Sequence, residues 1–112
     1  MVVINTYADV ETAPLDDSMK NYLYTYLQRL LQLYETDTLA EWGSIFILQS
    51  PADLESYQKM GLSQSLDENQ LESLEWLHLG GRYVLQGTYI FNNDYAISIF
   101  IEEFVYHQMK EG

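Results

Sequence analysis

The sequence contains no cysteine, few basic residues and no long apolar run. Without cysteine it has neither disulfides nor thiol chemistry, which favours the reducing cytoplasm. Its apolar runs are far shorter than the roughly 20 residues of a membrane span. The N-terminus has no basic segment ahead of a hydrophobic stretch, so we expect no signal peptide. These absences predict a soluble, cytoplasmic protein.

Basic residues are the scarcest group for a chain of this size. Five Lys and Arg face 17 Asp and Glu, which gives a net charge of −12. No basic residue stands between Arg29 and Lys59, or between Lys59 and Arg82. On a helix surface, a Lys or Arg four residues away usually reduces the repulsion between acidic side chains. Direct binding to nucleic acid requires Lys and Arg that neutralise phosphates. We therefore expect a basic protein partner, with no direct binding to nucleic acid and no membrane association.

The size and the apolar content predict one packed domain over residues 1–112. The chain has 112 residues, of which 47% are hydrophobic, enough to form a core. Ten residues are tyrosines, whose large ring and polar hydroxyl suit both core edges and interfaces.

Hydrophobic periodicity and capping residues predict an α+β fold. We expect a mixed sheet of about four strands, with helices packed largely on one face, a C-terminal β-hairpin and a short terminal helix. The predicted strands are residues 2–7, 44–49, 82–91 and 95–103, and the predicted helices are residues 18–35, 51–60 and 66–79.

The apolar arc of the helix over residues 18–35 covers about half of its circumference, more than a single core-facing stripe requires. Two interpretations stand. The favoured one packs this helix under the sheet, and the alternative lets one flank contact a second subunit.

Two strands near the C-terminus alternate between apolar and weaker positions. A three-residue loop over residues 92–94 pairs Phe91 with Tyr95, Tyr89 with Ile97 and Leu85 with Ile101. That register places the strongly apolar faces of both strands on the same side of the hairpin.

Residues 66–79 carry helix signals. Ser65 followed by Glu68 matches a capping box, and two glycines follow Leu79. On such a helix Glu68, Glu72 and Glu75 would form one row of carboxylates with Trp76 beside it. The row can imitate the phosphates and bases that a nucleic-acid-binding protein recognises, although an ordinary solvated face explains the row taken alone. The predicted partner-binding residues are Glu68, Glu72, Glu75, Trp76, Asp16, Asp17, Asp53 and Glu55.

Signals for catalysis are weak. Glu75 and His78 have a spacing used in di-iron helical bundles, but such sites need the motif twice. Glu103 and His107 lack a third ligand, and no glycine-rich phosphate loop is present. We expect no catalytic residue, no metal and no cofactor, and therefore no enzyme.

The leading hypothesis is an acidic protein-binding module, an inhibitor that occupies a basic, nucleic-acid-binding surface of its partner. Nuclease immunity proteins, antirestriction proteins and anti-CRISPR proteins act in this way; the likeness is one of composition and gives no residue a role. The alternative is a structural or assembly protein that forms a homodimer through residues 19–34 and the hairpin edge.

Overall fold

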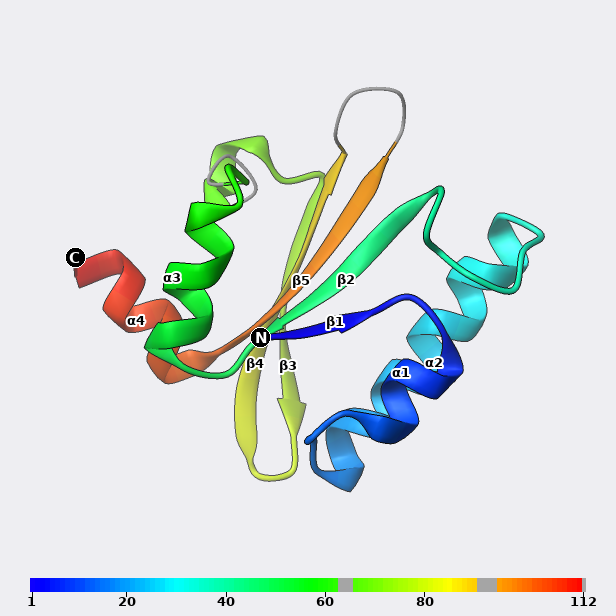
Figure 1. The fold of residues 1–112 in the computed structure, drawn as a ribbon. Helices are drawn as coiled ribbons and strands as arrows, with labels where there is room; N and C mark the ends of the chain where they lie inside the picture. Colours follow the sequence, from blue (N-terminus) through cyan, green and yellow to red (C-terminus); the bar gives the residue numbers. More distant parts are fainter. Residues whose placement is uncertain (63–65, 91–94, 112) are drawn as a thin grey trace.

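A five-stranded mixed sheet forms the centre of the molecule (Figure 1). The computed structural model describes residues 1–62, 66–90 and 95–111. The strand order is β1-β2-β5-β4-β3; β2 and β5 are parallel and the other neighbours are antiparallel. The predicted α+β class is confirmed, with one strand more than expected. The elements are β1 (Val2–Ile4), α1 (Tyr7–Thr12), α2 (Asp17–Leu33), β2 (Gly43–Leu48), α3 (Pro51–Lys59), η2 (Glu68–Gln70), β3 (Ser73–Leu79), β4 (Arg82–Ile90), β5 (Ala96–Glu102) and α4 (Glu103–Glu111).

The predicted hairpin register is confirmed where the structure describes it. Leu85 lies opposite Ile101, and Tyr89 lies opposite Ile97. The predicted loop consists of residues 92–94, and the predicted pair with Tyr95 includes Phe91. Residues 91–94 lie outside the described ranges. Both edges of this hairpin are covered, since β4 also pairs with β3 and β5 with β2. The hairpin therefore offers no free edge for the predicted dimer.

Helices cover both faces of the sheet, so the prediction that they pack largely on one face is wrong. Figure 1 shows α1 and α2 on one side and α3 and α4 on the other. The reason lies in β2, where Ile45 and Ile47 join the core under α2 while Phe46 and Leu48 join the core under α3 and α4. A strand that is apolar on both faces requires cover on both.

Two N-terminal boundaries differ from those predicted. Strand β1 ends at Ile4 rather than at residue 7, and helix α1, which was not predicted, follows it at Tyr7–Thr12. Thr6 and Asp9 form a reciprocal capping box, in which each side chain accepts a hydrogen bond from the other residue's backbone N–H. That short-range pair starts a helix of only six residues.

The predicted helices over residues 18–35 and 51–60 are confirmed as α2 and α3. Helix α2 buries Met19, Leu23, Leu27 and Leu31 against the sheet, as the favoured interpretation of its apolar arc requires. Helix α3 begins with Ser50 as N-cap and Pro51 at the first position. The short terminal helix is present as α4, which buries Val105. None of the described helices combines the length and the apolar character that crossing a membrane requires.

The predicted helix over residues 66–79 is wrong, because residues Ser73–Leu79 form strand β3. Gly80 and Gly81 have φ angles of 58° and 77°, the left-handed values of a two-residue hairpin turn between antiparallel strands. Their role is to join β3 to β4 rather than to end a helix. Ser65, the predicted cap, lies outside the described residues.

Candidate protein-binding surface

Strand β3 stands at the end of the sheet, and its outer side has no neighbouring strand among the described residues. We call the outer side of Ser73–Leu79 the β3 edge. In a hairpin closed by a two-residue turn, the residues flanking the turn exchange both backbone hydrogen bonds, and bonded and non-bonded pairs then alternate. Leu79 and Arg82 flank the turn. The backbone N–H and C=O groups of Leu74, Trp76 and His78 therefore point to the β3 edge.

The two faces of β3 carry different side chains. On the α4 side Leu74 and Trp76 are 42% and 44% exposed. Trp76 meets the ring of Tyr106 edge-on, with centroids 5.3 Å apart. On the α2 side Leu77 and Leu79 pack against the core. The β3 edge is therefore flanked by an apolar, partly exposed surface on its α4 side.

Glu75 lies on the α2 side of β3, opposite in direction to Trp76, because successive side chains of a strand alternate between faces. Its charge acts on α2: burial, and next the negative charge of Glu75, raise the pKa of Tyr22 above its ordinary value, while Arg29 opposes the shift. Glu75 is exposed and forms no ion pair within the described residues.

The predicted row of carboxylates does not exist as a helical stripe. Glu72 precedes β3 and donates its backbone N–H to the carbonyl oxygen of Thr88, 2.8 Å away. Glu68 lies in η2, and its side chain is outside the described part of the structure. The strand places Glu75 and His78 on opposite faces as well, so the spacing that suggested a shared metal site has no geometric counterpart. His78 instead stacks on Tyr83, with centroids 4.7 Å apart.

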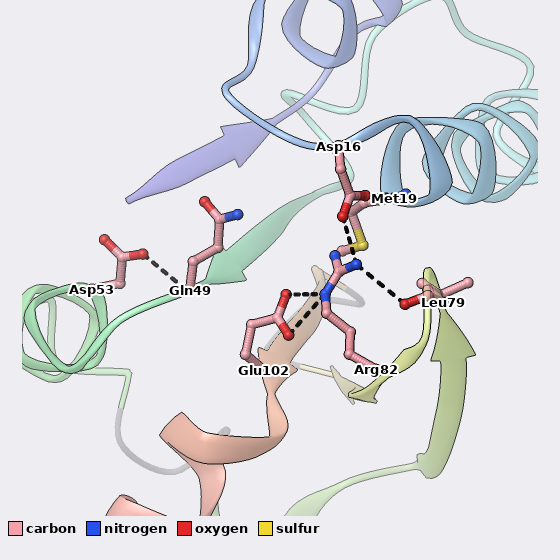
Figure 2. Close-up of polar contacts among 7 residues, drawn as sticks. All are labelled: Asp16, Met19, Gln49, Asp53, Leu79, Arg82 and Glu102. Carbon is pink, nitrogen blue, oxygen red and sulfur yellow. Dashed lines mark hydrogen bonds and ion pairs between the residues drawn. The ribbon is translucent and has the colours of Figure 1, made fainter.

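Asp16 belongs to an ion-pair cluster at the turn end of the β3–β4 hairpin. Figure 2 shows the Arg82 guanidinium between the carboxylates of Asp16 and Glu102, at 2.5 Å and 2.8 Å. The hydrogen bond from the Met19 N–H, and then the hydrogen bond and charge of Arg82, hold the pKa of Asp16 below its ordinary value against the opposing effect of burial. The cluster joins the N-terminus of α2 to β4 and β5, and it explains Asp16 as a structural residue.

Asp53 and Glu55 are also engaged. Asp53 accepts a hydrogen bond from the backbone N–H of Gln49 at 2.9 Å, and its other carboxylate oxygen lies 3.0 Å from the N-terminal ammonium group (Figure 2 draws the Gln49 contact). Glu55 pairs with Lys59 one turn along α3, at 3.1 Å. Asp17, at the start of α2, is exposed. The predicted contact residues with described side chains therefore lie on or next to several elements, α2, α3 and β3, and three of them are engaged within the chain.

A second acidic region, not among the predicted contacts, follows α2. Tyr34 and Trp42 stack with centroids 5.1 Å apart and planes 7° from parallel. Glu35, Asp37 and Glu41 stand close to them in the chain, are exposed and form no ion pair among the residues that the structure describes. The lack of Lys and Arg between residues 29 and 59 was the sequence signal for these acids.

The β3 edge was also missed by sequence reasoning, and its signal was present. Two glycines separate Leu74–Leu79 from Arg82–Leu85, and a two-residue Gly-Gly spacer between such segments is typical of a hairpin. Comparison with family models, with curated proteins and with solved structures found no match.

Proposed function

We propose that this chain is a small acidic binding module that occupies a basic, nucleic-acid-binding surface of a partner protein and inhibits it there. The supporting observation is the excess of carboxylates, 17 against five basic residues. In the described residues the ion pairs involve only Asp16, Asp53, Glu55 and Glu102. A surface with this charge accelerates encounter with a cationic protein.

Among the predicted contacts, the structure favours those on and beside β3. Asp16, Asp53 and Glu55 already hold positive or N–H groups of the chain itself, so a partner would have to compete for them. Glu72, Glu75 and Trp76 are exposed and lie on or next to β3, whose outer side has no neighbouring strand among the described residues. An exposed Trp is a frequent anchoring residue at interfaces, and the carboxylates of Glu72 and Glu75 would attract a cationic partner to the same strand. In this proposal the chain carries no catalytic residue.

Affinity capture at two salt concentrations tests the proposal. The tagged chain is incubated with an extract of its native host near 50 mM and near 300 mM salt, and captured proteins are challenged with duplex DNA and with a neutral polymer. We expect a basic protein to be retained at low salt, to be lost at high salt as charges are screened, and to be displaced by DNA but not by the neutral polymer. If the amount of captured protein changed neither with salt nor on addition of DNA, the proposal would be wrong.

The alternative function, a homodimer through residues 19–34, has less support. That segment packs Met19, Leu23, Leu27 and Leu31 against the sheet. Both outer edges of the β4–β5 hairpin are already paired with other strands. Two copies, each with a net charge of −12, would also repel one another. Sedimentation over a range of protein concentrations separates the two functions, because the binding module is expected to remain monomeric.

A further inference from the structure

The two edges of the sheet are unequal, and the longer one is open. Strand β1 has three residues and β3 has seven. Along the β3 edge the backbone groups of Leu74, Trp76 and His78 point away from β4. An unpaired edge of this kind is a template on which a further strand can add.

The β3 edge lacks most devices that keep an edge strand from pairing. Proteins protect such edges with Pro, with Lys or with a covering element. Strand β3 contains neither Pro nor Lys, and no described helix or loop lies along its outer side as a paired segment. Its one central charge is Glu75. A carboxylate at that position repels an acidic strand and attracts a cationic one.

A second copy of the chain is a poor occupant for this edge. The symmetric antiparallel alignment that pairs all seven residues sets Glu75 opposite Leu77 of the other copy and diagonal to the other Glu75. It also joins two chains of net charge −12. Charge therefore favours a cationic partner strand over self-pairing.

We propose that the β3 edge binds an extended basic segment of the partner as a sixth strand of the sheet. Because side chains alternate between faces, the segment would present Lys or Arg on the α2 side, toward Glu75, and apolar side chains on the α4 side, toward Leu74 and Trp76. The α4 side is less suited to a further cation, because Lys110 already lies there, 5.6 Å from the ring centroid of Tyr106. The inference rests on the proposed function and specifies how and where the cationic partner docks.

Synthetic peptides test the mode of binding. The probe is an octapeptide of alternating Lys and Val, titrated into the Trp42→Phe variant so that Trp76 is the remaining tryptophan. We expect the fluorescence of Trp76 to change, and the amides of Leu74, Trp76 and His78 to become protected from hydrogen exchange. N-methylation of alternate residues along one side of the peptide removes its main-chain donors and is expected to weaken binding about tenfold or more. A block peptide of four Lys and four Val controls for composition and charge. Equal binding of the N-methylated or block peptide would overturn the inference.

Two charge reversals locate the site. Glu75→Lys and Glu11→Lys each replace a carboxylate with an ammonium group and so change the net charge from −12 to −10. Glu11 is exposed on α1, which follows β1, the edge strand at the opposite end of the sheet from β3. We expect Glu75→Lys to weaken the alternating peptide about tenfold and Glu11→Lys to weaken it about twofold or less. Equal weakening by both variants would mean that general charge, not the β3 edge, attracts the peptide.

The same variants separate failure of this inference from failure of the proposed function. If both variants retain a salt-sensitive partner as well as the unmodified chain does, the acidic module stands and the β3 edge is not its docking site. If the peptide binds the edge while no cationic protein is captured at low salt, the edge stands and the proposed function fails. A concentration-dependent dimer whose formation protects the amides of Leu74, Trp76 and His78 from hydrogen exchange would show that a second copy occupies the edge, against the inference.

Discussion

The two edge strands of the sheet differ in length and in how the chain continues next to them. Beyond β1 the backbone is bound by its own neighbours: the Asn5 N–H donates to Asp9 at 2.8 Å, and the Asn5 carbonyl accepts from Leu39 at 3.0 Å. Strand β3 is longer and has no neighbouring strand on its outer side in the described part of the chain. A short edge tied down by capping residues serves stability, whereas a long, unpaired edge beside Glu75 and Trp76 is available for recognition.

The largest expected effect concerns stability at the β1 edge. Ile4 is fully buried, so Ile4→Ala should lower the free energy of unfolding by about 2–5 kcal/mol, through lost burial and a remaining cavity. Val3, next to it, is 38% exposed, and Val3→Ala should cost about 0.5 kcal/mol. Urea denaturation measures both. Equal losses would mean that β1 is not anchored through one face.

A smaller effect is expected at the turn that holds β3 on the sheet. Gly81 has a φ of 77° and open space around the position of a Cβ, so Gly81→Ala introduces backbone strain without a clash. We expect a loss of about 1–2 kcal/mol in the free energy of unfolding. Gly81→Asn should cost less, because Asn tolerates the left-handed conformation. If Ala and Asn proved equally harmless, the two-residue turn would be wrong, and with it the position of β3.

The contrast between the edges was only partly predictable from the sequence. The register of β4 and β5 was predictable because strict alternation fixes which residues share a face: Leu85 opposite Ile101 is the arrangement that unites the apolar sides. Strand β3 was missed because Glu and Leu at helical spacing, behind a capping-box pattern, favour a helix locally. Pairing with β4 through Gly80 and Gly81 is a tertiary effect that outweighs this preference.

The candidate site was affected by the same error. The acidic character was visible in the composition, but its placement depended on the secondary structure. A helix would set Trp76 beside Glu75, whereas the strand turns them to opposite faces. Asp16 could not be recognised as an ion-pair partner, since Arg82 is 66 residues away in the chain.

The ion pair of Asp16 with Arg82 should make stability depend on pH in the acid range. A lowered pKa in the folded state stabilises the fold fully above the unfolded value, about 3.9, and this contribution is lost as the pH falls through the folded pKa. Asp16→Asn keeps a capping side chain but removes the charge. We expect it to be less stable than the unmodified chain near neutral pH by less than about 1 kcal/mol, because Asp16 is half exposed.

Denaturation curves from neutral pH down to about pH 3 check this dependence. The difference between the two proteins should shrink as the solution becomes acidic. A difference that stayed constant across the acid range would exclude Asp16 as its source.

The smallest expected effect is a change in the ionisation of Tyr22. Glu75 contributes, after burial, to the raised pKa of Tyr22, so Glu75→Gln should bring that pKa closer to its ordinary value. Trp76→Phe, on the opposite face, should leave it unchanged. Titration of the Tyr22 ring by NMR distinguishes the variants, and an effect of Trp76→Phe equal to that of Glu75→Gln would contradict the assigned faces.

Hydrogen exchange along residues 73–79 of the free protein tests the central claim most directly. A strand with one paired and one open edge predicts alternation: the amides of Glu75 and Leu77 should exchange slowly, and those of Leu74, Trp76 and His78 rapidly. Uniform protection of all five amides would contradict the account, because it would mean that the segment is helical or that its outer edge is already paired.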